Sequence, residues 1–84
     1  MLKLKPNCEC CDTDLPPESL NARACSFECT FCRECAETHF DNLCPNCGGE
    51  LLRRPIRPVE HLVRNPASTD RFLKAHPECA HLQT

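Results

Sequence analysis

Hydrophobic residues make up 40% of the 84-residue chain, but this share includes 10 cysteines, and the chain has no Trp or Tyr. So little apolar material excludes a fold held together by a conventional hydrophobic core alone, and it indicates metal ions or disulfides as additional cross-links. The net charge is −2, with an excess of acids in residues 1–50 and of bases in residues 51–84, and the acidic first part is a poor surface for a phosphate backbone.

We expect a small, metal-stabilised α+β fold in two parts. Residues 1–52 are predicted to form a two-zinc domain, and residues 53–84 a Pro- and Arg-rich linker with a partly flexible tail. Within the first part, residues 23–27 and 30–33 are predicted to pair as a short hairpin whose turn holds Glu28 and Cys29.

A short helix is predicted over residues 34–43, because Ala36, Phe40 and Leu43 repeat at helical spacing. Pro45 prevents its extension. A Gly-Gly turn at residues 48–49 then leads into a short strand over residues 50–52.

The second part is dominated by prolines. Alternate prolines in residues 53–58 disfavour helix and central strand, so this segment is predicted to be extended. Asn65 as a cap and Pro66 at a first helical position predict a short helix over residues 66–76, which Pro77 ends. A flexible tail is nevertheless the favoured interpretation, and the helix the alternative, because isolated helices of this length are marginal in water.

The cellular compartment decides what the cysteines do. Residues 1–6 are short and charged and lack the apolar run of a signal peptide, and no stretch approaches the length of a membrane span. We therefore expect a cytoplasmic protein without membrane contact, whose thiols bind metal. A disulfide scaffold and free redox thiols are the alternatives.

Eight of the ten cysteines are spaced as metal ligands. A Cys-x-x-Cys pair can place two sulfurs on one ion at a Zn–S distance of about 2.3 Å. Three such pairs and two further cysteines predict two Zn(II) ions per chain, each bound by four sulfurs. These eight residues are Cys8, Cys11, Cys25, Cys29, Cys32, Cys35, Cys44 and Cys47.

The first and last pairs lie in matching Cys-x-x-Cys-x-x-x-Leu segments, residues 8–15 and 44–51. Both segments are typical of zinc knuckles, turns in which backbone N–H groups face the sulfurs and the leucine packs beneath the metal. The eight ligands can then be shared between two ions sequentially, as Cys8 to Cys29 and Cys32 to Cys47, or in an interleaved order.

Residues 25–35, followed by Cys44-Pro45-Asn46-Cys47, resemble the RING finger in their tight ligand spacing, the aromatic Phe31 before a ligand and the closing Cys-Pro-x-Cys pair. The resemblance covers roughly half the chain and implies a treble-clef fold with interleaved, cross-braced sites. It assigns one ion to Cys8, Cys11, Cys32 and Cys35, and the other to Cys25, Cys29, Cys44 and Cys47.

The whole chain also resembles a family of short bacterial cysteine-rich proteins known as a domain of unknown function. The resemblance runs from Pro6-Asn7-Cys8-Glu9-Cys10-Cys11 to Asn65-Pro66-Ala67-Ser68. It implies a cytosolic bacterial protein and supplies no activity.

Three further residues have open roles. Cys10 is expected to be a spare thiol. Cys79 lies beside His76 and His81, which is either a third metal site or, as we expect, part of a solvated tail. His39 is an alternative ligand in place of Cys25 or Cys29, although such a histidine is more often exposed.

The sequence favours a structural protein over an enzyme. Sites with four thiolates leave no coordination position for a reacting water, and no catalytic constellation is visible. The RING resemblance would suggest ubiquitin-ligase-like activity, but Glu9-Cys10 and Gly48 replace residues that such ligases use, and the chain has no Trp.

We therefore expect a monomeric zinc module that acts as an adaptor for a protein partner, whose identity the sequence does not reveal. The alternative is a nucleic-acid binder that uses Arg53, Arg54, Arg57 and Arg64, against which the acidic zinc domain argues. A zinc-storage or redox role would instead be marked by rapid zinc release on mild oxidation.

Overall fold

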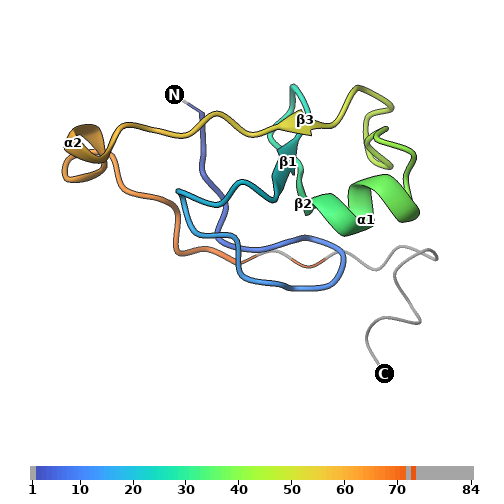
Figure 1. Ribbon diagram of the computed structural model, residues 1–84, viewed down its shortest axis with the longest axis horizontal. Coiled ribbons are helices and arrows are strands. Elements are labelled where there is room, and N and C mark those ends of the chain that lie inside the picture. Colours follow the sequence, from blue (N-terminus) through green and yellow to red (C-terminus); the bar gives the residue numbers. More distant parts are fainter. Residues whose placement is uncertain (1, 72, 74–84) are drawn as a thin grey trace.

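The computed structural model describes residues 2–71 and 73. A small antiparallel sheet and a short helix lie among long irregular loops, which confirms the predicted small α+β class (Figure 1). The elements are β1 (Ala22–Ala24), β2 (Thr30–Cys32), α1 (Arg33–Thr38), β3 (Leu52–Arg53) and α2 (Val59–Leu62).

The sheet has three strands in the order β2-β1-β3. Strands β1 and β2 form the predicted hairpin, shorter than expected, with Ala22 opposite Cys32. In its turn, Glu28 N donates to Cys25 O at 3.1 Å, and Glu28 has a left-handed φ of 68°. Strand β3 pairs with the other side of β1, where Arg53 lies opposite Arg23.

Helix α1 follows β2 without a loop. Cys32 is its N-cap, and its sulfur accepts a hydrogen bond from Cys35 N at 3.4 Å. The helix ends at Thr38, so the predicted end at residue 43 is wrong. Asp41 and Asn42 adopt left-handed φ values of 52° and 61° and turn the chain back on itself.

The apolar residues Ala36, Phe40 and Leu43 keep helical spacing in the sequence, but they do not lie on one helix. Phe40 is buried, but it lies beyond the end of α1, and Leu43 is 53% exposed. The backbone closes this turn when Asn42 N donates to Ala36 O at 2.7 Å. The apolar face predicted from these residues belongs to a helix followed by a tight turn, and not to one longer helix.

Residues 54–58 have neither helix nor strand, and they pack against the beginning of the chain. Arg54 is 1% exposed, and Arg57 Nη2 donates to Leu2 O at 2.7 Å. Further along, Ser68 N donates to Leu4 O at 2.9 Å. The two ends of the described chain are thus joined by several hydrogen bonds.

The possible helix over residues 66–76 is absent where the structure describes this segment. Residues 66–71 have no helix, and residues 72 and 74–76 lie outside the described part. Instead α2 begins after Pro58, and Asn65 N closes the following turn by donating to His61 O at 2.9 Å. Asn65 therefore ends a helical turn and does not begin a helix.

Cysteines and other apolar residues contribute about equally to the core of the described residues. Its main cluster holds seven cysteines and six other apolar residues. Phe31 and Phe40 are packed with ring centroids 5.0 Å apart. The cluster consists of Cys8, Cys10, Leu15, Ala22, Cys25, Cys29, Phe31, Cys32, Cys35, Ala36, Phe40, Cys44 and Leu51.

Within residues 2–71 and 73, no helix has the length and apolar character needed to cross a membrane. The longest helix there, α1, has six residues.

Candidate metal centre

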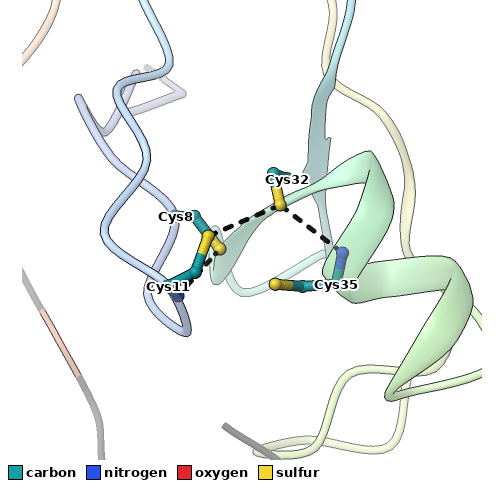
Figure 2. Close-up of side chains that lie close together, drawn as sticks. All are labelled: Cys8, Cys11, Cys32 and Cys35. Atoms are coloured by element: carbon teal, nitrogen blue, oxygen red, sulfur yellow. Dashed lines mark hydrogen bonds between the residues drawn. The ribbon is translucent and has the colours of Figure 1, made fainter. Parts of the chain in front are cut away.

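Four sulfurs from two distant parts of the chain meet at the start of α1, and we call this group site 1 (Figure 2). Cys8 and Cys11 come from the N-terminal loop, and Cys32 and Cys35 from the end of β2 and the first turn of α1. All four Sγ atoms lie within 4.8 Å of one another, and those of Cys11 and Cys32 are 3.7 Å apart.

These distances suit a tetrahedral metal site. With Zn–S bonds of about 2.3 Å, tetrahedral geometry places neighbouring sulfurs about 3.8 Å apart. A tetrahedral set of four sulfurs favours zinc or iron among the biological metals. The residues of site 1 therefore fit a zinc ion held by four thiolates.

Backbone N–H groups surround the sulfurs of site 1. Cys10 N and Cys11 N point at Cys8 Sγ at 3.4 and 3.5 Å, and Cys35 N donates to Cys32 Sγ. Such donors partly offset the negative charge that four thiolates bring to one dication. The N–H groups of this turn and of the first turn of α1 thus favour the ionised form of the sulfurs.

In site 1, the thiols of Cys8, Cys32 and Cys35 have pKa values that are shifted in different directions. A hydrogen bond from the Cys32 side chain lowers the pKa of Cys8 to about 5, and the same bond raises the pKa of Cys32. Burial raises the pKa of Cys35 to about 12. One thiolate thus forms readily, and the other buried sulfurs need a nearby cation to ionise.

A buried carboxylate, Glu9, joins the first knuckle to β2. Glu9 is 1% exposed, and its Oε2 accepts hydrogen bonds from Thr30 N at 2.6 Å and Lys5 Nζ at 3.1 Å. Its own backbone N donates to Thr30 O at 2.9 Å. Glu9 therefore fixes the distance between the two halves of site 1, a role that its place between two cysteines did not reveal.

The two knuckle segments have the same backbone geometry. Asp12 N donates to Cys8 O at 3.0 Å, and Gly48 N donates to Cys44 O at 2.8 Å. Asp12 and Gly48 both have left-handed φ values, 64° and 78°. The leucine that ends each segment is 2% exposed. The repeat seen in the sequence is thus a repeat of structure.

A second group of sulfurs, which we call site 2, consists of Cys25, Cys44 and Cys47. Their Sγ atoms also lie within 4.8 Å of one another. Cys29, the fourth predicted ligand, is buried but lies outside this group, and its Sγ accepts a hydrogen bond from Asn46 Nδ2 at 3.4 Å. Burial raises the pKa of Cys44 to about 12, so its sulfur too needs a cation to ionise.

The groups are interleaved along the chain, because site 1 takes sulfurs from residues 8–11 and 32–35 while site 2 takes them from residue 25 and residues 44–47. The sequential alternative would have combined Cys8 and Cys11 with Cys25, which the structure places in the other group. The role of these residues as metal ligands stays a prediction.

The remaining candidates have separate outcomes. Cys10 is completely buried and disulfide-bonded, so the expectation of a spare thiol is wrong for this residue. His39 is half-buried and belongs to neither sulfur group of the described chain. Cys79, His76 and His81 lie outside the described residues.

The fold and the sulfur groups together define a small cysteine-rich α+β protein whose thiols are gathered as possible metal sites. The chain belongs to the family described as "Protein of unknown function (DUF1272)", which matches residues 1–57. It is 65% identical over 74 residues to an uncharacterized protein, R02474, of Rhizobium meliloti (strain 1021), and the match covers 88% of each chain. No solved structure matches the chain. The predicted resemblance to a family of unknown function is therefore confirmed.

Proposed function

We propose that this protein is a structural zinc-binding module that carries two zinc ions and serves as an adaptor between protein partners. The observation that carries the proposal is the meeting of four cysteine sulfurs from residues 8–11 and 32–35 within 4.8 Å. Zinc bound by four thiolates has no position for substrate, so its contribution is to folding. In the second site, we assign Cys29 as the fourth ligand beside Cys25, Cys44 and Cys47.

The arrangement supports a RING-like treble clef. A knuckle, the β1–β2 hairpin and the first turn of α1 contribute to site 1, and a second knuckle contributes to site 2. The interleaved order of the two groups is the order that cross-braced RING fingers use. We infer that the two ions together replace the larger apolar core that a chain of this size lacks.

A ubiquitin-ligase-like activity has less support. RING ligases present an apolar side chain inside the first knuckle, whereas Glu9 stands here and is buried against Thr30. We therefore propose a non-enzymatic role in the cytoplasm, with a monomeric chain as the working form.

Nucleic-acid binding through the arginines is the second alternative. Arg54 is buried and donates to three backbone carbonyls, and Arg57 donates to Leu2 O and Asn65 O. Arg53 and Arg64 remain exposed, beside an acidic first half. Two of the four arginines are thus used within the fold, which favours a protein partner over a phosphate backbone.

Metal content tests the structural part of the proposal. Native mass spectrometry of the purified chain is expected to show two zinc ions, and EDTA should abolish the folded far-UV circular dichroism spectrum. The expected loss is large because a structural zinc contributes on the order of 10 kcal/mol to folding. Cys32→Ser should act like EDTA, while the exposed Glu37→Ala is the control and should keep both ions. A chain that stays folded without metal would contradict the proposal.

Partner capture tests the adaptor part. The zinc-loaded chain is used as bait in an extract of its host, with a metal-free bait as the control. Phe27 is a suitable probe because it is 75% exposed at the hairpin turn. A specific partner should be lost with the metal-free bait and weakened by Phe27→Ser. Equal capture by both baits would argue against an adaptor that depends on the zinc fold.

A further inference from the structure

The two sulfur groups differ in their access to solvent. In site 1, Cys8, Cys32 and Cys35 are between 0% and 8% exposed, and Cys11 is half-buried. In site 2, by contrast, Cys47 is exposed. An incoming ligand therefore meets an accessible sulfur in site 2 and a largely covered set in site 1.

The groups also differ in the elements that hold them. Cys32 and Cys35 lie on β2 and α1, and Glu9 ties the opposite knuckle to β2. The knuckle of site 2 lies in the irregular segment between α1 and β3. Each knuckle is closed by one isolated β-bridge, Asn7–Asp14 in site 1 and Leu43–Glu50 in site 2. The side chains of Glu9 and Arg54 attach the first knuckle and its flanks to β2 and to the segment after β3, so we expect local opening to be easier at site 2.

The sulfur sets differ as well. Site 1 brings four Sγ atoms within 4.8 Å of one another, whereas site 2 brings three. The sulfur of Cys29 instead accepts the hydrogen bond from Asn46 Nδ2. Because the sulfur of Cys29 has to move toward the other three to complete a four-sulfur site, site 2 is less preorganised for a metal than site 1.

We propose that site 2 holds an exchangeable zinc ion, which passes to a thiolate-bearing acceptor, and that site 1 holds the permanent structural ion. This inference rests on the proposed function, because it requires zinc in both sites. Exchange proceeds by substitution: an acceptor thiolate binds the zinc as Cys47 leaves it, and further acceptor sulfurs replace the remaining ligands in turn. No oxidation occurs, and each displaced thiolate takes up a proton from water or from the acceptor thiol.

The release kinetics of the two-zinc protein test the inference. The full chain is mixed with an excess of the chromogenic chelator 4-(2-pyridylazo)resorcinol, and free zinc is followed by absorbance. We expect two phases of one zinc each, with the first about tenfold faster or more, because local opening is cheaper at site 2. A single phase that releases both ions together would overturn the inference and leave the proposed function intact.

Two variants assign the phases. Cys47→Ser should bind one ion, keep its folded circular dichroism spectrum and show only the slow phase. Cys11→Ser is the matched control, since it removes the more accessible sulfur of the other knuckle, and it should lose the slow phase together with the fold. If Cys47→Ser unfolds, or if Cys11→Ser removes only the fast phase, the assignment is wrong.

Cadmium-substituted wild-type protein gives a readout that needs no variant. Two ¹¹³Cd resonances are expected, each assigned to its cysteines through couplings to their β-protons. With less than one equivalent of EDTA, the resonance coupled to Cys44 and Cys47 should disappear first. Prior loss of the resonance coupled to Cys8 and Cys35 would overturn the inference, and a chain that binds no metal would instead refute the proposed function.

Discussion

Substitution of Arg54 tests whether the segment after β3 is an integral part of the zinc fold. Arg54 is 1% exposed, and its guanidinium donates to Lys5 O at 2.8 Å, Pro16 O at 3.0 Å and Leu15 O at 3.3 Å. These carbonyls lie on either side of the first knuckle. One side chain thus closes the loop that carries Cys8 and Cys11 and attaches it to the sheet.

The expected loss of stability on substitution of Arg54 follows from these three hydrogen bonds. Arg54→Ala leaves up to three carbonyls without their donor, and each unsatisfied buried group costs about 1–3 kcal/mol. Water can reach some of them through the space that the side chain leaves. We therefore expect the free energy of unfolding to fall by about 3–5 kcal/mol, which is a large part of the stability of a small domain. Arg54→Lys should recover only a fraction, because an ammonium cannot reproduce the planar fork.

The assay is guanidinium unfolding followed by far-UV circular dichroism, with all variants at the same excess of free zinc. Far-UV detection is needed because the chain has no Trp or Tyr. Arg53→Ala is the matched control, since Arg53 is the exposed neighbour of Arg54, and it should change stability by less than about 0.5 kcal/mol. Equal effects of Arg53→Ala and Arg54→Ala would refute the assigned role of the buried guanidinium.

Three further predictions concern the knuckles and their metal. Glu9→Ala should lower the free energy of unfolding by about 1–3 kcal/mol, and Glu9→Gln by less, because an amide oxygen still accepts from Thr30 N; the exposed Glu37→Ala is the control in the same denaturation assay. Gly48→Ala should lower the free energy of unfolding by about 1 kcal/mol, because Gly48 has a left-handed φ of 78°. Gly48→Asn should cost less, since Asp12 adopts this conformation at the same place in the first knuckle. Melting temperatures measure both effects, and equal costs would show that the two turns are not equivalent. Cysteine binds zinc as the deprotonated thiolate, so metal-dependent stability is present at neutral pH and is lost as the pH falls. Equilibrium dialysis at decreasing pH should show declining zinc content, and full retention at about pH 3 would contradict thiolate ligation.

The cysteine spacing predicted much of the architecture because its chemistry is local. Two Cys-x-x-Cys-x-x-x-Leu segments have the same turn, and their backbone hydrogen bonds are fixed by that turn alone. The hairpin followed from short segments on either side of residues 28–29 and was found with shorter strands. The end of α1 was not predictable from periodicity, because Phe40 and Leu43 keep helical spacing across a turn formed by Asp41 and Asn42.

The parts that sequence reasoning missed depend on distant partners. Arg54 lies in a run of arginines and prolines that is typical of an exposed linker, and its burial is decided by carbonyls on residues 5, 15 and 16. Glu9 is a charged residue beside cysteines, and only the approach of Thr30 makes it a buried acceptor. In both cases the charged group satisfies backbone groups that another part of the fold leaves unpaired, which no local pattern records.

The interleaved order of the sulfurs makes the two sites unequal in what each one holds together. A metal in site 1 closes the loop between Cys11 and Cys32, and that loop contains both Cys25 and Cys29. Such a closure removes about 3 kcal/mol of chain entropy from the unfolded state by analogy with a disulfide of similar loop length. Loss of the ion from site 1 therefore frees the hairpin that brings Cys25 to site 2. Loss of the ion from site 2 leaves β2 and α1 joined to the first knuckle by Glu9 and by the four remaining sulfurs. Because the dependence runs mainly in one direction, the ion of site 2 can exchange while the fold persists, whereas the ion of site 1 cannot.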